Sequence, residues 1–173
     1  MDINDYDNIL EELVFTNSKC FVNNSTYEHS TSVIKKIFLE GEGRAYIFTD
    51  SFNPSIYCKE NLINSAISFL NKDKNELSVI LKREQNCKKK NNWFLDYLKD
   101  YKEKIHLFMA DDKLKEIIEN CMVVKTKKGN YAVRLEMDPS EHIATGCFNA
   151  GESGRTLFNQ LGKFIEEGRV KFI

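Results

Sequence analysis

The chain has 173 residues, of which 42% are hydrophobic and 12% aromatic, and its 25 basic and 26 acidic side chains leave a formal net charge of −1. This length and composition fit one domain with a hydrophobic core and exclude a disordered chain. The near-neutral charge argues against a general polyanion binder, which is usually strongly basic, but it is compatible with one local basic pocket.

The sequence carries no sign of a membrane span, a secretory signal or a zinc site. No apolar run approaches the ~20 residues that a membrane helix needs, and the acidic start MDINDYDNILEE does not resemble a signal peptide. The five cysteines are widely spaced and form no CxxC pair, so structural zinc is not expected. We therefore predict a cytoplasmic protein with reduced thiols, no metal, no cofactor and no membrane partner.

Hydrophobic periodicity divides the chain into alternating helices and strands. Apolar residues at helical spacing predict helices, and short, nearly unbroken apolar runs predict strands that are buried on both faces. In chain order, we expect helix 5–15, a polar loop 16–31 with a short strand at KCFV, helix 29–39, strand 45–49, helix 58–71, strand 76–82, a helix from Trp93 to Tyr101, strand 105–110, helix 111–120, strands 122–126, 131–136 and 143–149, and helix 153–167.

This order of elements indicates an α/β fold with a mixed, mostly parallel sheet that is flanked by helices in two or three layers. Its first three long strands are expected to pair in parallel through right-handed crossovers, because helices separate them. Gly129 lies between two short strands that look like a hairpin. We predict a single domain over residues 1–173, with residues 1–28 as an N-terminal extension packed on it.

The first candidate site follows strand 45–49, where Asp50, Ser51 and Asn53 form a strand-to-loop corner. Ligands of open α/β sheets gather at the carboxyl ends of the strands, so this corner is a candidate binding site. The same residue types are also typical of a turn and a helix cap, and the sequence leaves both interpretations open.

The second candidate site is the corner between the last strand and the last helix. Residues 146–149 read Gly-Cys-Phe-Asn and lead into AGESG and an amphipathic helix. With the order of elements over roughly residues 30–168, they resemble one half of a phospholipase D-like protein, whose pattern is H-x-K-x-x-x-x-D followed by G-S-x-N before a helix. The family's spacing places Ala132 at the position of its His, Arg134 at that of its Lys, and Asp138 one residue short of its Asp.

The resemblance implies a degenerate member that keeps a phosphate cradle and lacks the nucleophile. In the family the His forms a phosphohistidine intermediate, and the Lys and Asn hold the phosphate; Ala132 cannot attack phosphorus. Arg134 could still bind phosphate through its planar fork of donors, Asn149 could still donate, and Cys147 takes the position of the family's hydroxyl. The backbone N–H groups of residues 151–154 are expected to add an anion-binding helix start.

Arg134 and Glu136 alternate with Val133 and Leu135, so the two charged side chains share one face of their strand. Such a pair fits a solvated pair at a sheet edge as well as a phosphate site. The sequence does not decide between the two interpretations.

A catalytic alternative uses other residues near this corner. His142 precedes Gly146 by four residues and is either a displaced nucleophile or proton donor, or an exposed turn residue. Cys147 would need a base to act as a catalytic thiol, and His142 is the one available nearby in sequence. With Arg134 on the phosphate, either residue would give an active phosphodiesterase.

A basic run, KREQNCKKK, precedes an apolar helical stripe. Lys88, Lys89 and Lys90 could track a nucleic-acid backbone while Trp93 stacks on bases. The alternative to nucleic-acid binding is a solvated loop beside a helix whose aromatic side chains belong to the core.

From these observations we predict a non-catalytic, phospholipase D-like module, a pseudo-phosphodiesterase, that binds a partner protein or a phosphate-bearing ligand such as nucleic acid. The resemblance implies a homodimer by analogy with family members that carry one motif per chain. A role as a component of a bacterial or mobile-element system, with a protein partner, is a further hypothesis. The alternative is an active phosphodiesterase or nuclease that uses His142 or Cys147 with Arg134.

Overall fold

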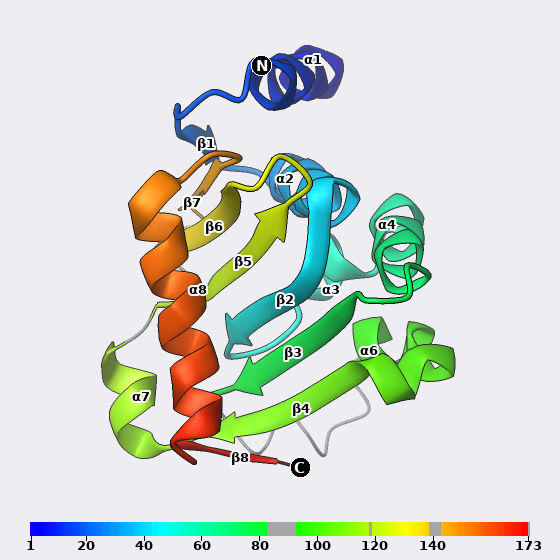
Figure 1. Cartoon of the computed structure of the whole chain (residues 1–173). Helices are drawn as coiled ribbons and strands as arrows, with labels where there is room; N and C mark the ends of the chain where they lie inside the picture. Colours follow the sequence, from blue (N-terminus) through cyan, green and yellow to red (C-terminus); the bar gives the residue numbers. More distant parts are fainter. Residues whose placement is uncertain (83–92, 118, 139–142, 173) are drawn as a thin grey trace.

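The computed structural model describes residues 1–82, 93–117, 119–138 and 143–172. Their backbone forms one sheet with helices on both of its faces (Figure 1). The sheet has the strand order β1-β7-β6-β5-β2-β3-β4-β8. Its strands are Val22–Asn24 (β1), Gly41–Thr49 (β2), Glu76–Leu81 (β3), Ile105–Ala110 (β4), Cys121–Thr126 (β5), Tyr131–Asp138 (β6), Ile143–Cys147 (β7) and Val170–Phe172 (β8).

The predicted α/β class with a mixed sheet is confirmed, but the prediction of a mostly parallel sheet is wrong. The pairs β2–β3 and β3–β4 are parallel, as the apolar runs and the intervening helices predict. All other pairs in the described sheet are antiparallel: β1–β7, β2–β5, β4–β8, β5–β6 and β6–β7. For β5–β6 and β6–β7 the physical reason is the short links between successive strands, which join antiparallel neighbours and are too short for a crossover. The other three antiparallel pairs join strands that are distant in the chain.

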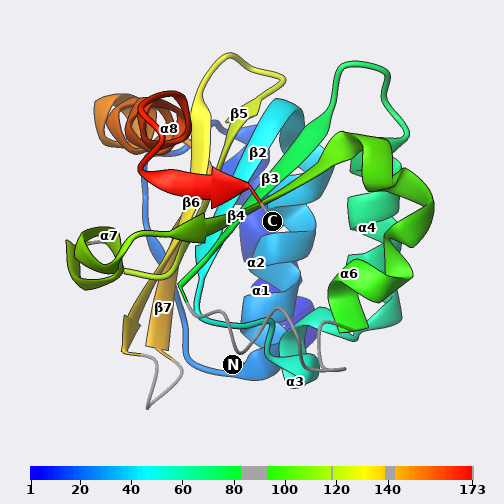
Figure 2. The same ribbon diagram turned by 90° about the horizontal axis from the view of Figure 1, so that it is seen from below.

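Helices form a layer on each face of the sheet. Figure 2 shows α2, α4 and α6 on one side and α7 and α8 on the other. The helical elements are α1 (Ile3–Phe15), α2 (Tyr27–Glu40), α3 (Pro54–Tyr57), α4 (Glu60–Leu70), α6 (Trp93–Tyr97), a 3-10 helix (Lys99–Lys104), α7 (Asp112–Ile117) and α8 (Gly151–Glu166). The arrangement is therefore a three-layer helix–sheet–helix sandwich.

Each face of the sheet has its own hydrophobic core. Along β6 the side chains alternate, so Ala132 packs in the core under α2 and Val133 packs in the core under α8. Arg134 and Glu136 are two and four residues after Ala132, so their side chains lie on the same face of the sheet as Ala132, the α2 face. This alternation decides which part of the fold each candidate site residue can reach.

The N-terminal residues are tied to the α2 layer and to the sheet. Tyr6 and Leu10 of α1 are buried, and Glu11 forms an ion pair with Lys36 of α2. β1 then joins the sheet beside β7. Residues 22–24 are thus a strand of the sheet itself, whereas the expectation for residues 1–28 was an extension packed on the domain. The division of the chain into domains stays a prediction.

Candidate functional site

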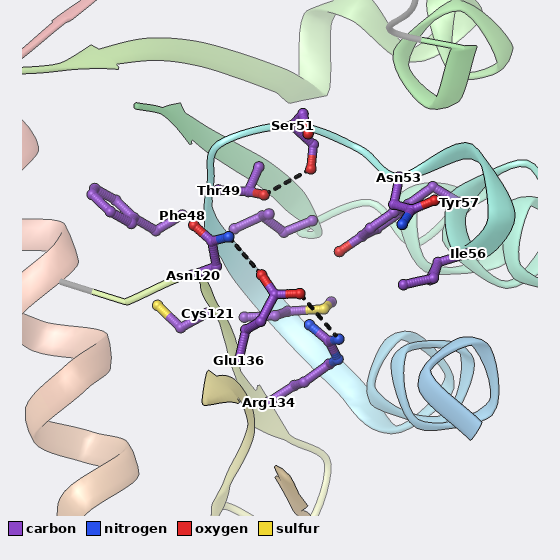
Figure 3. A pocket seen from close by; sticks show the side chains of 12 residues that line it. Phe48, Thr49, Ser51, Asn53, Ile56, Tyr57, Asn120, Cys121, Arg134 and Glu136 are labelled. Atoms are coloured by element: carbon purple, nitrogen blue, oxygen red, sulfur yellow. Dashed lines mark hydrogen bonds and ion pairs between the residues drawn. The ribbon is translucent and has the colours of Figure 1, made fainter. Parts of the chain in front are cut away.

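A small pocket with a cavity volume of about 30 Å³ lies at the carboxyl end of β2, where the sheet changes from parallel to antiparallel pairing (Figure 3). It lies on the α2 face, between the loop after β2, the short helix α3 and the end of β6. Its lining residues are Ile47, Phe48, Thr49, Ser51, Asn53, Ile56, Tyr57, Asn120, Cys121, Met122, Arg134 and Glu136. A change of strand direction at the carboxyl end of a strand is a common place for ligands in α/β sheets.

Strand register brings the polar residues of this pocket together. Arg134 of β6 pairs with Met122 of β5, and Met122 pairs with Ile47 of β2. One row further along, the Glu136 N–H donates to the Asn120 carbonyl at 2.9 Å. Residues far apart in the chain therefore reach the pocket from adjacent strands of one sheet face.

The Arg134 guanidinium is buried and poorly satisfied. Arg134 is 6% exposed, and its Nη2 lies 3.4 Å from Ser30 Oγ of α2, to which it donates. The nearest carboxylate oxygen of Glu136 is 3.9 Å from the same nitrogen. Its Nε is buried, and no described residue offers it a hydrogen-bond partner. Buried polar groups are normally hydrogen-bonded, so this guanidinium has donor capacity to spare.

Glu136 is held more firmly than Arg134. Its Oε2 accepts a hydrogen bond from Asn120 Nδ2 at 2.5 Å, and Asn120 Oδ1 in turn accepts from the Asp50 N–H at 3.2 Å. The other carboxylate oxygen, Oε1, faces Arg134. Asn120 thus connects the corner after β2 to the end of β6 and fixes which Glu136 oxygen faces the guanidinium.

Hydroxyl and amide groups complete the pocket wall. Thr49 Oγ1 donates to the Ser51 carbonyl at 2.9 Å, and Asn53 Oδ1 accepts from the Ser55 N–H at 2.9 Å as the cap of α3. Burial raises the pKa of the Tyr57 phenol to about 12, with a lowering contribution from Arg134 and a raising one from Glu136. The Tyr57 hydroxyl therefore stays a neutral donor at ordinary pH.

The structure brings four of the residues singled out in the sequence into this pocket: Arg134, Glu136, Ser51 and Asn53. Asp50 is adjacent and binds Asn120 through its backbone, but it does not line the pocket. Asn53 also caps α3, so the capping interpretation holds for its Oδ1. The interpretation of Arg134 and Glu136 as a solvated edge pair is wrong, because both side chains lie largely buried on the α2 face.

Cys147 and Asn149 do not reach the pocket. Cys147 pairs with Val133 in the register of β6 and β7, so its side chain lies on the opposite face of the sheet from Arg134. Its thiol is within 3.6 Å of the Lys19 carbonyl, and burial raises its pKa, which disfavours a thiolate. Asn149 Nδ2 donates to the Asn17 carbonyl at 3.0 Å. Both side chains fasten the segment between α1 and β1, and Cys147 cannot share one site with Arg134.

The glycines of this corner are explained by close packing. A Cβ atom on Gly146 would lie 2.7 Å from Val33 Cγ1 of α2, and one on Gly154 would lie 2.7 Å from Tyr131 Cβ. The Ala150 N–H donates to the Tyr131 carbonyl at 2.8 Å, which places the start of α8 at the beginning of β6. The expected anion-binding helix start is therefore on the α8 face, away from the Arg134 pocket.

Several predicted residues lie outside what the structure describes. His142 and the three lysines Lys88, Lys89 and Lys90 fall outside the described residues, and of Trp93, the first residue of α6, the backbone alone is described. Within the described ranges, no group of three or more His, Cys, Asp or Glu side chains is placed to hold a metal ion. No helix of that part of the chain is long and apolar enough to cross a bilayer.

Sequence reasoning missed two pocket residues, Tyr57 and Asn120. Asn120 immediately precedes β5. A polar residue at the start of a strand is the feature of the sequence that could have indicated it as a pocket residue. That signal points to the pocket only if β5 is known to run antiparallel beside β2, which places its start at the carboxyl end of β2. Tyr57 reads in the sequence as one more aromatic side chain.

Comparison with known proteins identifies a similar fold and no family. No family model matches the chain, and no curated protein matches it. Among solved structures, the chain is similar to TrmBL2, an archaeal chromatin protein whose structure shows a novel mode of DNA binding. The TM-score is 0.59 at 13% sequence identity, and the match covers 98% of this chain and 61% of that protein. The chain therefore spans less than two thirds of that protein, and the likeness shows the fold alone.

Proposed function

We propose that this chain is a non-catalytic binding module that holds a phosphate-bearing ligand, nucleic acid foremost, in the Arg134 pocket. The observation that carries the proposal is the buried guanidinium of Arg134. Among the described residues its Nε has no hydrogen-bond partner, and its Nη2 lies 3.9 Å from Oε1 of Glu136. A charged donor group that is left this incomplete in a pocket is suited to an anionic ligand.

The shape of the guanidinium favours phosphate. Arginine presents its N–H groups as a planar fork that matches two oxygens of a phosphate. Ser51, Asn53 and the neutral Tyr57 hydroxyl line the same pocket and offer further hydrogen bonds to phosphate oxygens. In a largely buried site each of these contacts is stronger than it would be in water.

The pocket favours binding over bond cleavage. Ala132 occupies the position where the phospholipase D-like pattern has its nucleophilic His, and it is fully buried. Cys121 is the cysteine among the described lining residues, but its side chain packs in the core under α8, and burial raises its pKa to about 12, so it is a poor nucleophile. The wall that the structure describes contains no histidine that would activate a hydroxyl.

The choice of nucleic acid among phosphate-bearing ligands is supported by the fold comparison. TrmBL2, which shares the fold, is described as binding DNA. By analogy, this chain would bind nucleic acid through its pocket. The phospholipase D-like ancestry remains a proposal that rests on Gly146, Asn149 and the order of elements. A homodimer and a protein partner likewise remain proposals from the sequence.

The proposal is tested by fluorescence anisotropy with labelled DNA oligonucleotides that carry a 5′-phosphate, single-stranded and duplex, on the wild type and on Arg134→Met. We expect the wild type to bind and the variant to lose about tenfold to a hundredfold in affinity, because a hydrogen-bonded charge is removed. Arg155→Met is the matched control, since Arg155 is an exposed side chain of α8 on the other face. Equal affinity of Arg134→Met and the wild type would show that DNA does not bind at this pocket.

A further inference from the structure

We infer that the pocket takes a terminal phosphate, a phosphomonoester, and rejects an internal phosphodiester of a nucleic-acid backbone. This inference rests on the proposed function and names the part of the ligand that enters. It follows from the carboxylate beside Arg134, from the way that carboxylate is held, and from the depth of the guanidinium.

The pocket carries one charge of each sign. Arg134 and Glu136 are the formally charged side chains among the described residues that line it, and Arg134 Nη2 lies 3.9 Å from Glu136 Oε1. An anion that reaches the guanidinium therefore also meets a carboxylate oxygen. Two unprotonated oxygens repel each other at hydrogen-bond distance, so the ligand must carry a proton there.

A phosphomonoester can supply that proton and the competing anions cannot. Its second pKa is about 6, so near neutral pH part of the population still carries a P–OH group. That group can donate to Glu136 Oε1 while the other phosphate oxygens accept from Arg134 and its neighbours. A phosphodiester and inorganic sulfate have no such hydroxyl at this pH, and both would be repelled by Glu136.

Glu136 cannot easily turn away to admit an unprotonated anion. Asn120 holds its Oε2 at 2.5 Å, and the Asp50 N–H holds the Asn120 amide at 3.2 Å. These two hydrogen bonds keep the Asn120 Nδ2 atom on the carboxylate and leave Oε1 toward the pocket. Glu136 therefore acts as a fixed acceptor that selects a ligand with a donor.

The neighbouring titratable groups do not replace Glu136 in this role. Burial raises the pKa of the Tyr57 phenol to about 12 and that of the Cys121 thiol to about 12, so both are neutral. Burial also raises the pKa of the Tyr6 phenol, which is close enough to Arg134 for the guanidinium to lower it in part. His29 of α2 stacks on Tyr6 with ring centroids 4.0 Å apart.

The depth of Arg134 also favours a chain end. The side chain is 7% exposed, whereas Glu136 is 17% exposed and Ser51 is exposed at the rim. Ile47, Ile56 and Met122 line the pocket with apolar side chains. A phosphodiester carries a substituent on both sides and needs a groove that is open in two directions, whereas a terminal phosphate enters by one end.

The test is titration calorimetry at pH 6, where about half of a phosphomonoester carries its second proton. The ligands are one oligonucleotide with a 5′-phosphate, the same oligonucleotide with a 5′-hydroxyl, inorganic phosphate and inorganic sulfate. We expect the 5′-phosphate to bind at least about tenfold more tightly than the 5′-hydroxyl, as for a hydrogen bond to a charged group, and phosphate to bind where sulfate does not.

Glu136→Gln is the decisive variant, because its amide can donate as well as accept. We expect it to bind sulfate and phosphate alike, while Glu152→Gln, an exposed acid of α8, keeps the wild-type preference. Equal affinity for the two oligonucleotides, or sulfate binding by the wild type, would overturn the inference. If the two oligonucleotides bind equally but still depend on Arg134, the proposed function survives and the inference alone fails; if neither binds, both fail.

Discussion

The Arg134 pocket and the corner at residues 146–149 share the strand pair β6–β7, and they differ in how fully their polar groups are used. In the pocket, Arg134 Nε is buried and has no hydrogen-bond partner in the part of the chain that the structure describes. At the corner, the side chains of Cys147 and Asn149 each contact a backbone carbonyl between α1 and β1. The polar side chains at the corner are therefore used in contacts within the fold, whereas the pocket contains a buried donor that no described residue satisfies.

The residues that carry the family resemblance are therefore not the residues that form the pocket. The residues that resemble the phospholipase D-like pattern most closely, Gly146 to Asn149, serve packing and anchoring. Arg134, which stands where that pattern has its Lys, belongs to a pocket that is completed by Tyr57 and Asn120. A short motif can therefore reflect packing and anchoring, while the residues proposed to bind a ligand are a different set.

The largest effect is expected at the corner, from Gly146→Ala. The new Cβ would lie 2.7 Å from Val33 Cγ1, and overpacking of a buried site costs typically about 1–3 kcal/mol of unfolding free energy. Urea denaturation measures the loss.

Val33→Ala provides the control, because it removes the atom that the new methyl group meets. We expect the double variant to be at least about 1 kcal/mol more stable than the sum of the single effects predicts. Additive effects would mean that Gly146 is not required by its contact with α2.

A smaller loss is expected for Asn149→Ala, which leaves the Asn17 carbonyl without its 3.0 Å hydrogen bond. Removing one partner of such a bond costs about 1–3 kcal/mol when the other is buried, and less here because the pair is part-buried. Thermal unfolding measures the stability, and anisotropy with DNA measures binding. A clear loss of DNA affinity in a folded Asn149→Ala variant would move the binding site to the corner.

The smallest change in stability is expected in the pocket, from the double variant Arg134→Met with Glu136→Gln. Replacing a buried charge pair by neutral side chains is often neutral or stabilising, so we expect a change of less than about 1 kcal/mol together with the loss of phosphate binding. A loss of stability as large as that of Gly146→Ala would mean that the charges serve the fold, and the contrast between the two regions would disappear.

Much of the fold could be predicted from the sequence because its signals are local. The apolar runs in β2, β3 and β4 and the helices between them predict parallel pairing, which the structure confirms. The direction of β5 beside β2 is not a local property, because it depends on which edge of the sheet the later strands join. Three-residue strands such as β8 are too short for a periodic signal.

The site could be predicted in part for the same reason. Arg134, Ser51 and Asn53 stand out by residue type and by their position at strand ends. Their convergence with Tyr57 and Asn120 depends on the register of β6 on β5 and of β5 on β2, and side-chain alternation alone does not specify that register. The face on which Cys147 lies follows from the register of β7 on β6.

The two strands at the edges of the described sheet, β1 and β8, have three residues each. Very short edge strands present few unpaired backbone groups, which discourages the addition of a strand from another molecule. Two copies of this chain would therefore gain little by continuing one sheet into the next. A homodimer of the kind that the sequence suggests would have to be built from side chains of the helical layers or from an open part of a sheet face.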